Sequence, residues 1–148
     1  MTAIRLCSPE DAGSVLPLVA RFHEEYGLDT TEEHREMALT PLLEGSPLGA
    51  VWIFGPARAP VGYMVVTFSW SLAMGGMDAY LDEIYIRPSV RGRGIASEAL
   101  HAVGKALREG NVRALHLEVD RSAPATQRLF EKAGFRLRDR FGLMGMTL

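Results

Sequence analysis

The sequence predicts an α/β fold formed by one domain, residues 1–148, and three observations support this prediction. Apolar residues near the start of the chain recur every three or four positions, which is the period of an amphipathic helix. Three segments rich in β-branched and aromatic residues follow between positions 51 and 86. A glycine-rich loop then joins the last of these strands to a second amphipathic helix. Because 47% of the 148 residues are hydrophobic, the chain can form a core of its own.

The first third of the chain predicts one strand and two helices. Residues 3–6 form the strand, and a serine and a proline then supply an N-cap and a favoured first helical residue. The helix that follows ends at Gly27 and buries a stripe of apolar side chains, namely Ala12, Val15, Leu16, Val19, Phe22 and Tyr26. Thr30 and Glu33 have capping-box spacing, so we expect a second helix there, interrupted at Pro41.

The middle of the chain predicts three strands. Residues 51–54 and 61–68 flank a turn rich in glycine and proline, which indicates an antiparallel hairpin. Residues 79–86 are rich in β-forming side chains and predict a further strand. The apolar segment between these strands, residues 69–77, contains two glycines and forms either a plain hairpin loop or a mobile rim over a pocket.

The last third of the chain predicts helix, strand, helix and strand. Residues 94–109 have the apolar spacing of a helix, which Gly110 and Asn111 terminate. Residues 114–119 form a buried strand, and another helix then reaches Ala133. Residues 136–148 are expected to form a last strand or hairpin. The predicted order is therefore β-α-α-β-β-β-α-β-α-β.

Composition excludes several classes of function. A formal net charge of -2 argues against nonspecific binding of nucleic acid, because a surface that follows phosphates is strongly basic. Cys7 is the single cysteine, so neither an internal disulfide nor a cysteine-based zinc site can form. The four histidines are not spaced as metal ligands, and we expect no metal. No apolar run approaches the ~20 residues that cross a bilayer, and no signal peptide is evident, so we expect a cytoplasmic protein.

The loop between residues 86 and 97 has the composition of a phosphate-binding loop. Glycines between a strand and a helix allow backbone N–H groups to converge on one point, where the helix N-terminus favours an anion. Arg91 and Arg93 can add charge-assisted contacts. A Rossmann fingerprint is excluded because Ser97 occupies the place of its third glycine, and a P-loop is excluded because no Gly-Lys-Ser or Gly-Lys-Thr run exists.

Two segments resemble motifs of the GNAT superfamily of N-acetyltransferases. Arg91, Gly94 and Ala96 match motif A, which has Arg or Gln, two free positions, Gly, one free position, then Gly or Ala. Residues 117–135, which end in the sequence Leu-Phe-Glu-Lys-Ala-Gly-Phe, look like motif B. The resemblance implies a central mixed, mostly antiparallel sheet of six to seven strands flanked by about four helices.

The resemblance also implies how acetyl-coenzyme A, the acetyl donor of the family, would bind. The strand before the loop would pair with the pantetheine arm through the backbone of Ile84, Tyr85 and Ile86. The loop would hold the pyrophosphate through Arg91, Gly92, Arg93, Gly94, Ile95, Ala96 and Ser97. Motif B would contribute Ala123, Thr126 and Phe130.

Two of these positions depart from the family pattern. Ala123 stands where motif B usually has an asparagine, so binding would depend on the backbone and on Thr126. Phe130 stands where the family usually has the tyrosine that protonates the departing thiolate. A thiol with a pKa near ~8.5 is a tolerable leaving group without an acid, whereas a primary amine near ~10.4 must lose a proton before it attacks. A base is therefore needed more than an acid.

Asp82 and Glu83 are the candidate bases, because a carboxylate on the strand before the loop often has this role in the family. Strand alternation sends the two side chains to opposite faces unless a bulge intervenes. The run Tyr-Leu-Asp-Glu at residues 80–83 is similar to Tyr-Leu-Glu-Asp in the diamine acetyltransferases. On that comparison Asp82 takes the place of the acid that contacts the amine.

The acceptor is expected to be a primary amine of a small molecule, such as a polyamine, a diamine or an amino-acid-like compound. Regions that border the acceptor in the family carry Glu24, Glu25, Tyr26 and Glu118 here, and acids attract a cation. Two alternatives remain open at this point. One is acetylation of a protein lysine or N-terminus. The other, motivated by Phe130 and Ala123, is a module that binds acetyl-coenzyme A without significant catalysis. A homodimer is compatible with the resemblance.

Overall fold

The computed structural model describes residues 1–148 and contains two compact units, Met1–Glu118 and Val119–Leu148. The first unit contains a five-stranded sheet and three helices, and the second contains one helix. None of the helices has both the length and the apolar character that a membrane span requires.

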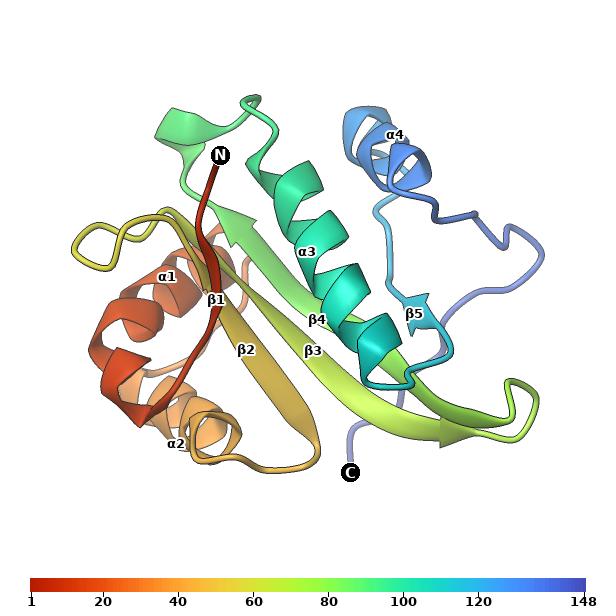
Figure 1. Ribbon diagram of the computed structural model, residues 1–148, viewed down its shortest axis with the longest axis horizontal. Helices are drawn as coiled ribbons and strands as arrows, with labels where there is room; N and C mark the ends of the chain where they lie inside the picture. The colour runs from red at the N-terminus through yellow and green to blue at the C-terminus, as the bar shows by residue number, and fades with distance from the viewer. The chain divides into compact units, whose positions relative to one another are not determined.

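The sheet has the strand order β1-β2-β3-β4-β5 (Figure 1). Its strands are β1 (Ile4–Leu6), β2 (Gly49–Phe54), β3 (Gly62–Ser71), β4 (Gly76–Ile86) and β5 (Leu115–His116). The first four strands pair antiparallel, and β4 pairs with β5 in parallel. Because parallel neighbours need a crossover, the connection from β4 to β5 contains a helix, α3 (Ile95–Glu109). The predicted mixed, mostly antiparallel sheet is confirmed.

The predicted number of strands, six to seven, is wrong, because the sheet has five. Only two residues of the predicted strand 114–119 form β5, so this strand offers little edge for a further partner. Residues 136–148 form no strand at all. Their apolar side chains are exposed, and β-propensity has little effect without a paired neighbour or burial.

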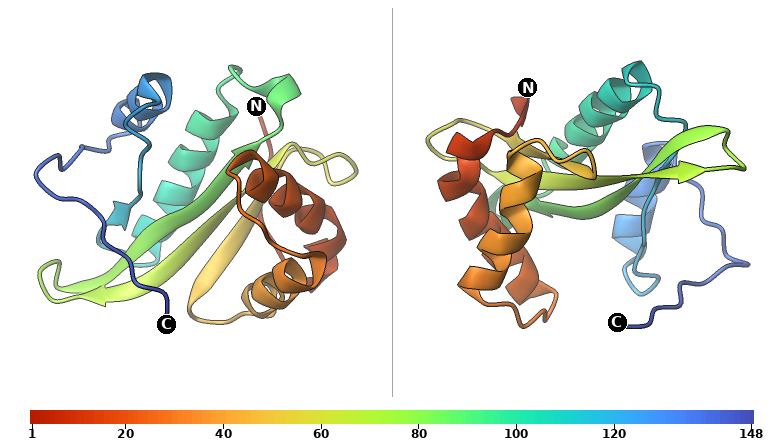
Figure 2. Two further views of the ribbon diagram at one scale, coloured as in Figure 1. Left: turned by 180° about the vertical axis from the view of Figure 1, so that it is seen from behind. Right: turned by 90° about the horizontal axis from the view of Figure 1, so that it is seen from below.

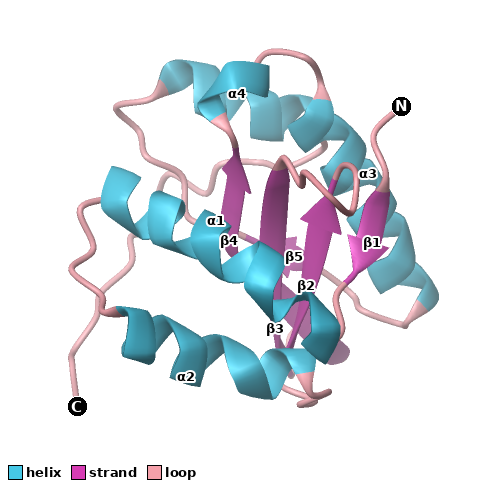
Figure 3. Ribbon diagram, turned by 90° about the vertical axis from the view of Figure 1, so that its left-hand side faces the viewer, coloured by secondary structure: helices cyan, strands magenta, loops and turns pink.

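Helices cover both faces of the sheet within the first unit. Helices α1 (Ala12–Glu25) and α2 (Glu32–Leu43) lie on one face, and α3 lies on the other (Figures 2 and 3). The core on the first face joins the apolar stripe of α1 to strand residues that point toward it, namely Val51, Ile53, Tyr63, Val65 and Tyr85. The stripe predicted from the sequence contributes Val15, Val19 and Phe22 to this core.

The helix ends differ from the prediction in three details. The serine and proline at positions 8 and 9 begin a short 3-10 turn that leads into α1. Thr31, not Thr30, caps α2, since its hydroxyl oxygen accepts from the backbone N–H of His34 at 3.1 Å. Pro41 does not interrupt α2, which continues to Leu43. Pro41 lies in the last turn, where the missing N–H removes only one helical hydrogen bond.

The hairpin of β3 and β4 is longer than predicted. Both strands extend into residues 69–77, leaving a short turn instead of a loop, so a mobile rim over a pocket is not present there. At the end of α3, Asn111 rather than Gly110 has the left-handed backbone conformation, with φ 64°.

The second unit contains α4 (Pro124–Lys132), followed by Gly134 in a left-handed conformation with φ 106°. Phe130 is the buried residue of this helix. Its ring meets that of Phe135 edge-on, with 5.7 Å between the centroids. The predicted helix is thus confirmed: Ala133 is its C-cap, and Gly134 follows in the conformation that ends a helix.

Gly62 allows the close approach of β3 and β4 near the end of β4. A methyl group built on Gly62 would overlap the carbonyl oxygen of Tyr85, which belongs to the backbone and cannot move aside cheaply. We therefore expect Gly62→Ala to lower the free energy of unfolding by more than about 2 kcal/mol, measured by urea denaturation. The matched control is Gly104→Ala, because Gly104 lies within α3 with open space around it. That change should stabilise the protein by roughly 0.5 to 1 kcal/mol; equal effects of both changes would contradict the argument.

Candidate active site

A β-bulge in β4 determines where the two candidate bases lie. In the pairing of β3 with β4, Val65 opposes Glu83 while the next residue, Val66, opposes Leu81, so Asp82 is the extra residue. A bulge interrupts the alternation of side chains, so neighbouring residues can face the same side of a sheet. The carboxylate of Glu83 pairs with His23 of α1, and the same histidine is close enough to Asp82 to lower its pKa when the imidazole is protonated. Both acids therefore lie near the C-terminal half of α1.

Glu83 is held by a donor on each carboxylate oxygen. The hydroxyl of Tyr63 donates to Oε1 at 2.6 Å, and Nε2 of His23 lies 2.7 Å from Oε2. The side chains of His23 and Glu83 are only 11% and 18% exposed, and Tyr63 is fully buried. Burial, together with the negative charge of Glu83, raises the pKa of the Tyr63 hydroxyl far above its usual range, so it acts as a donor. Contacts to both carboxylate oxygens fix the orientation of Glu83.

Asp82 is the freer carboxylate of the pair. Its side chain is exposed and makes no hydrogen bond with the protein. The pKa of Asp82 is raised, first by partial desolvation and then by the negative charges of Glu83 and Glu118, while His23 acts in the opposite direction. A carboxylate with a raised pKa is a better proton acceptor than an ordinary one. The two acids therefore differ: Glu83 is held in place by hydrogen bonds, whereas Asp82 is accessible to solvent.

The loop between β4 and α3 presents a row of free amide groups. Gly92 and Gly94 have left-handed backbone conformations, with φ 79° and 82°, and Gly94 is the N-cap of α3. The backbone N–H groups of residues 92–97 have no backbone or side-chain acceptor, whereas that of Glu98 donates to the carbonyl of Gly94. Unpaired amides at a helix N-terminus form a binding site for an anion such as phosphate.

The edge of β4 that precedes this loop is open on the β5 side. The parallel ladder with β5 ends at Tyr80, so the later residues of β4 pair only with β3. The N–H of Arg87 donates to the carbonyl of Val61, so alternate residues of β4 direct their backbone groups toward β3. Ile84 and Ile86 consequently direct their N–H and C=O groups to the open side. An extended ligand chain can pair with that edge.

The Arg91 side chain bonds to α1 and to β4. Its guanidinium donates to both carboxylate oxygens of Glu25 at 2.9 and 2.7 Å, and its Nε donates to the carbonyl of Ile86 at 2.8 Å. It also lies over the ring of Tyr85, 5.6 Å from the centroid. Arg91 was predicted to contact the cofactor and Glu25 to contact the acceptor. In the structure the two side chains form an ion pair with each other, which connects α1 to the loop.

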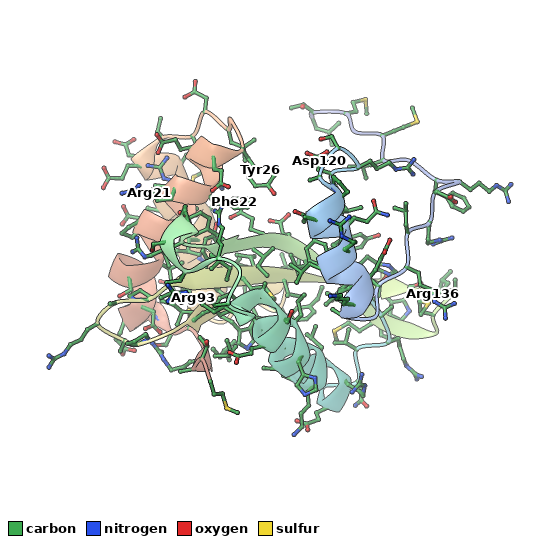
Figure 4. The ribbon with its side chains drawn as sticks, turned by 90° about the horizontal axis from the view of Figure 1, so that it is seen from above. Arg21, Phe22, Tyr26, Arg93, Asp120 and Arg136 are labelled. Atoms are coloured by element: carbon green, nitrogen blue, oxygen red, sulfur yellow. The ribbon has the colours of Figure 1, made fainter.

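Tyr26 extends from the same side of α1 as Phe22, whereas Arg21 extends from the opposite side (Figure 4). The rings of Tyr26 and Phe22 stack with 4.5 Å between their centroids, and Tyr26 is exposed. Arg93, which the figure also labels, lies exposed in the loop. Glu118 is exposed as well and close enough to Asp82 to raise its pKa.

Ser69, Asp78 and His116 form a second polar group, on β3, β4 and β5. The hydroxyl of Ser69 donates to Asp78 at 2.6 Å, and Nε2 of His116 lies 3.2 Å from the other carboxylate oxygen. The serine bonds to the acid and not to the histidine, so this is not the arrangement of an activated nucleophile. The group joins the three strands where the ladder to β5 is only two residues long.

Three predicted residues, Ala123, Thr126 and Phe130, belong to the second unit. Ala123 is the N-cap of α4 without a side-chain bond, and its carbonyl accepts from the N–H of Thr126 at 3.1 Å. No group of three or more His, Cys, Asp or Glu side chains is arranged to hold a metal ion.

The sequence reasoning missed three residues around Glu83, namely His23, Thr30 and Tyr63. A signal for His23 did exist, because it lies four residues after Val19 on the apolar stripe of α1, where a polar side chain needs a partner. Tyr63 gave no signal, since a tyrosine in a strand is ordinary.

One family model matches most of the chain, and solved structures share its fold. A family model described as the acetyltransferase (GNAT) family matches residues 17–135. An integron cassette protein, HFX_CASS3, from the mobile metagenome of Cole Harbour Salt Marsh is 28% identical, with a TM-score of 0.86 and coverage of 98% of this chain and 90% of its own. A protein from Arthrobacter sp. FB24 is also 28% identical, with a TM-score of 0.80 and coverage of 99% and 92%.

A third structure is similar in fold alone. It is AAC(6')-Iy in complex with the bisubstrate analogue CoA-S-monomethyl-acetylneamine, which is 14% identical, with a TM-score of 0.83 and coverage of 100% of this chain and 99% of its own. No curated protein matches the chain.

The raised pKa of Asp82 predicts a stability effect of known sign. Its ionised form is destabilised in the folded state, so the cost is absent below the unfolded-state pKa and fully present above the folded-state pKa. Asp82→Asn should therefore have a higher urea midpoint than the wild type at pH 7, and the difference should vanish near pH 3.

Asp11 supplies a control of opposite sign. Its hydrogen bonds with Arg5, and then with the backbone of Ser8, lower its pKa to about 2. Asp11→Asn should therefore be less stable than the wild type at pH 7. If Asp82→Asn were also less stable at pH 7, the placement of Asp82 among negative charges would be wrong.

Proposed function

The chain belongs to the acetyltransferase (GNAT) family, whose acetyl donor is acetyl-coenzyme A, and we propose that it acetylates a primary amine of a small cationic molecule. The observation that carries this proposal is the position of two unequal carboxylates, Asp82 and Glu83, on the same strand as the open edge and the free amides. The family match spans both compact units, and we therefore propose that residues 1–148 act as one domain.

The residues of the first unit fit the donor. Its pyrophosphate would be held by the free amides of residues 92–97 at the N-terminus of α3, where the helix dipole favours negative charge. Its pantetheine arm would pair with the outward backbone groups of Ile84 and Ile86. The guanidinium of Arg91 is paired with Glu25. We therefore assign the binding of the phosphates to the backbone amides and not to this side chain.

Asp82 is the base in this proposal. A primary amine with a pKa near ~10.4 enters as an ammonium ion, and it must give up a proton before its nitrogen can attack. The exposed carboxylate of Asp82 accepts that proton directly or through one water, because it makes no competing hydrogen bond and its pKa is raised. Glu83 remains ionised between Tyr63 and His23, and its charge attracts the ammonium ion.

Bound acetyl-coenzyme A would supply the acetyl carbon to which the amine nitrogen bonds while the carbon–sulfur bond breaks and the thiolate leaves. The nitrogen then loses its second proton to water or to the departing thiolate, which leaves a neutral amide. Outward N–H groups on the free edge of β4 can donate to the carbonyl oxygen as negative charge develops on it. Phe130 cannot protonate the thiolate, yet a thiol of pKa near ~8.5 leaves without an acid.

The charge near Asp82 favours a small cationic acceptor. Asp82, Glu83 and Glu118 influence one another and carry three formal negative charges, whereas Glu25 is neutralised by Arg91. The segment Tyr-Leu-Asp-Glu at residues 80–83 is similar to the diamine acetyltransferases, which supports a diamine or polyamine. AAC(6')-Iy, which binds an analogue that joins coenzyme A to an amine, supports an acceptor of the same chemical group.

An amine screen tests the proposed function. Acetyl-coenzyme A is supplied with diamines, polyamines, amino acids, lysine peptides and peptides with free N-termini, and thiol release is measured for each. We expect a diamine or polyamine to give the highest kcat/KM, and to lose this advantage at high salt because its attraction is electrostatic. A peptide as the best acceptor would overturn the small-molecule assignment. Binding of coenzyme A without thiol release from any acceptor would overturn catalysis.

Replacing the base should slow the reaction without loss of donor binding. We expect Asp82→Asn to lower kcat/KM for the best amine by about 10² to 10⁴-fold, because a positioned base contributes that much. The affinity for coenzyme A, measured by calorimetry, should stay within about twofold of the wild type. Glu109→Gln is the control, since Glu109 is an exposed acid at the C-terminal end of α3 and its side chain makes no hydrogen bond. If Asp82→Asn and Glu83→Gln both kept full activity across the pH range, these acids would have no catalytic role.

A further inference from the structure

His23 lies next to the carboxylate of Glu83, and Thr30 lies next to His23. His23 lies on the buried face of α1, where an unpaired imidazole would be costly. Its two ring nitrogens are both occupied, with Nε2 2.7 Å from Glu83 Oε2 and Nδ1 2.8 Å from Thr30 Oγ1. Thr30 lies in the connection between α1 and α2, so three separate elements meet at this imidazole.

The partners of His23 select one tautomer of its ring. An ionised Glu83 can only accept hydrogen bonds, so Nε2 must carry the proton. The guanidinium of Arg35 donates to the hydroxyl oxygen of Thr30 at 3.1 Å and also to its backbone carbonyl. The hydroxyl proton of Thr30 is therefore free to be donated to Nδ1, and a neutral imidazole with hydrogen on Nε2 satisfies every partner.

We propose that His23 is a positioning residue for the acetyl transfer, which keeps Glu83 ionised and immobile beside Asp82, and that Thr30 fixes the imidazole tautomer. This inference rests on the proposed function, because it assigns a role to a neighbour of the proposed base. His23 acts through Glu83 and does not touch the acceptor.

The groups around the imidazole explain why this position affects the reaction. Glu83 and Asp82 face it from β4, and Tyr63 faces Glu83 from β3. On its own helix the nearest ring is that of Phe22, Arg35 reaches it through Thr30, and Glu118 acts on Asp82. Without His23, Glu83 keeps one donor in a buried place, where the neutral acid is favoured. A neutral Glu83 would no longer attract the ammonium ion or strengthen Asp82 as a base.

Two substitutions of His23 test whether this residue positions Glu83 for the reaction or only stabilises the fold. In His23→Gln the side-chain amide can still donate to Glu83 but cannot titrate, whereas His23→Leu removes the donor and keeps an apolar side chain. We expect His23→Leu to lower kcat by about 10- to 100-fold with the KM for acetyl-coenzyme A unchanged, because a hydrogen bond to a charged group is lost. His23→Gln should retain kcat within about threefold.

The dependence of kcat/KM on pH gives a second test, because a residue that only stabilises the fold would not change it. In His23→Leu the acidic limb of kcat/KM should shift to higher pH, because the negative charge of Glu83 loses one of the two donors that stabilise it. In His23→Gln the limb should stay at the wild-type position. An unshifted limb in His23→Leu, or equal kcat in the leucine and glutamine variants, would overturn the proposal.

The neighbouring threonines provide a matched control. Thr30→Val removes the hydroxyl that bonds to His23, and kcat should fall by about two- to tenfold. Thr31→Val removes the cap of α2, so it should lower the melting temperature but leave kcat within about twofold. A larger loss of kcat in Thr31→Val than in Thr30→Val would contradict the assignment.

A measurement on the free protein separates this proposal from the proposed function. Nitrogen-15 NMR of the His23 ring should show hydrogen on Nε2 in the wild type, and a mixture of tautomers in Thr30→Val. Hydrogen on Nδ1 in the wild type would overturn the role of His23, whatever the activity. If the ring shows the Nε2 tautomer but no amine is acetylated by the wild type, the proposed function fails instead.

Discussion

A single extra residue in β4 determines where the two candidate bases of this protein lie. In a regular strand the side chains of Asp82 and Glu83 would face opposite sides of the sheet, and one of them would point away from α1. The bulge opposite Val65 and Val66 removes that alternation, so the two acids lie near the same histidine. Bulges bend a strand and increase its twist, and the ladder between β4 and β5 ends only two residues before this point. The paired acids and the open edge thus occur at the same place in the sheet.

The two acids differ because their surroundings differ. Glu83 is shielded and accepts hydrogen bonds from Tyr63 and His23, so its position is fixed. Asp82 has no such donors, and the charge of Glu83 contributes to its raised pKa. In the proposed function, therefore, Glu83 contributes negative charge beside the acceptor and Asp82 acts as the base. Removing either partner of Glu83 changes both acids, because the groups form one coupled network.

The loop before α3 depends on backbone groups more than on side chains. Gly92 and Gly94 adopt conformations that other residues rarely adopt, and this leaves the amides of residues 92–97 free at the end of the helix. Arg91, the charged residue of the motif, is engaged with Glu25 and with the carbonyl of Ile86. The guanidinium fastens the loop to α1, so the position of the amides and that of the helix carrying His23 are linked by one ion pair.

The sequence by itself determined the fold class, the order of the helices, the antiparallel hairpin and the glycine-rich loop before α3, because periodicity, glycine and helix caps are local signals. It also identified Asp82 and Glu83 by their place on the strand before the loop. Only the tertiary structure decided that the sheet has five strands, that a bulge brings these acids together, and that His23 and Tyr63 hold one of them. The reason is physical: strand number, bulges and hydrogen bonds between residues 60 positions apart depend on pairing and burial, which no local pattern encodes.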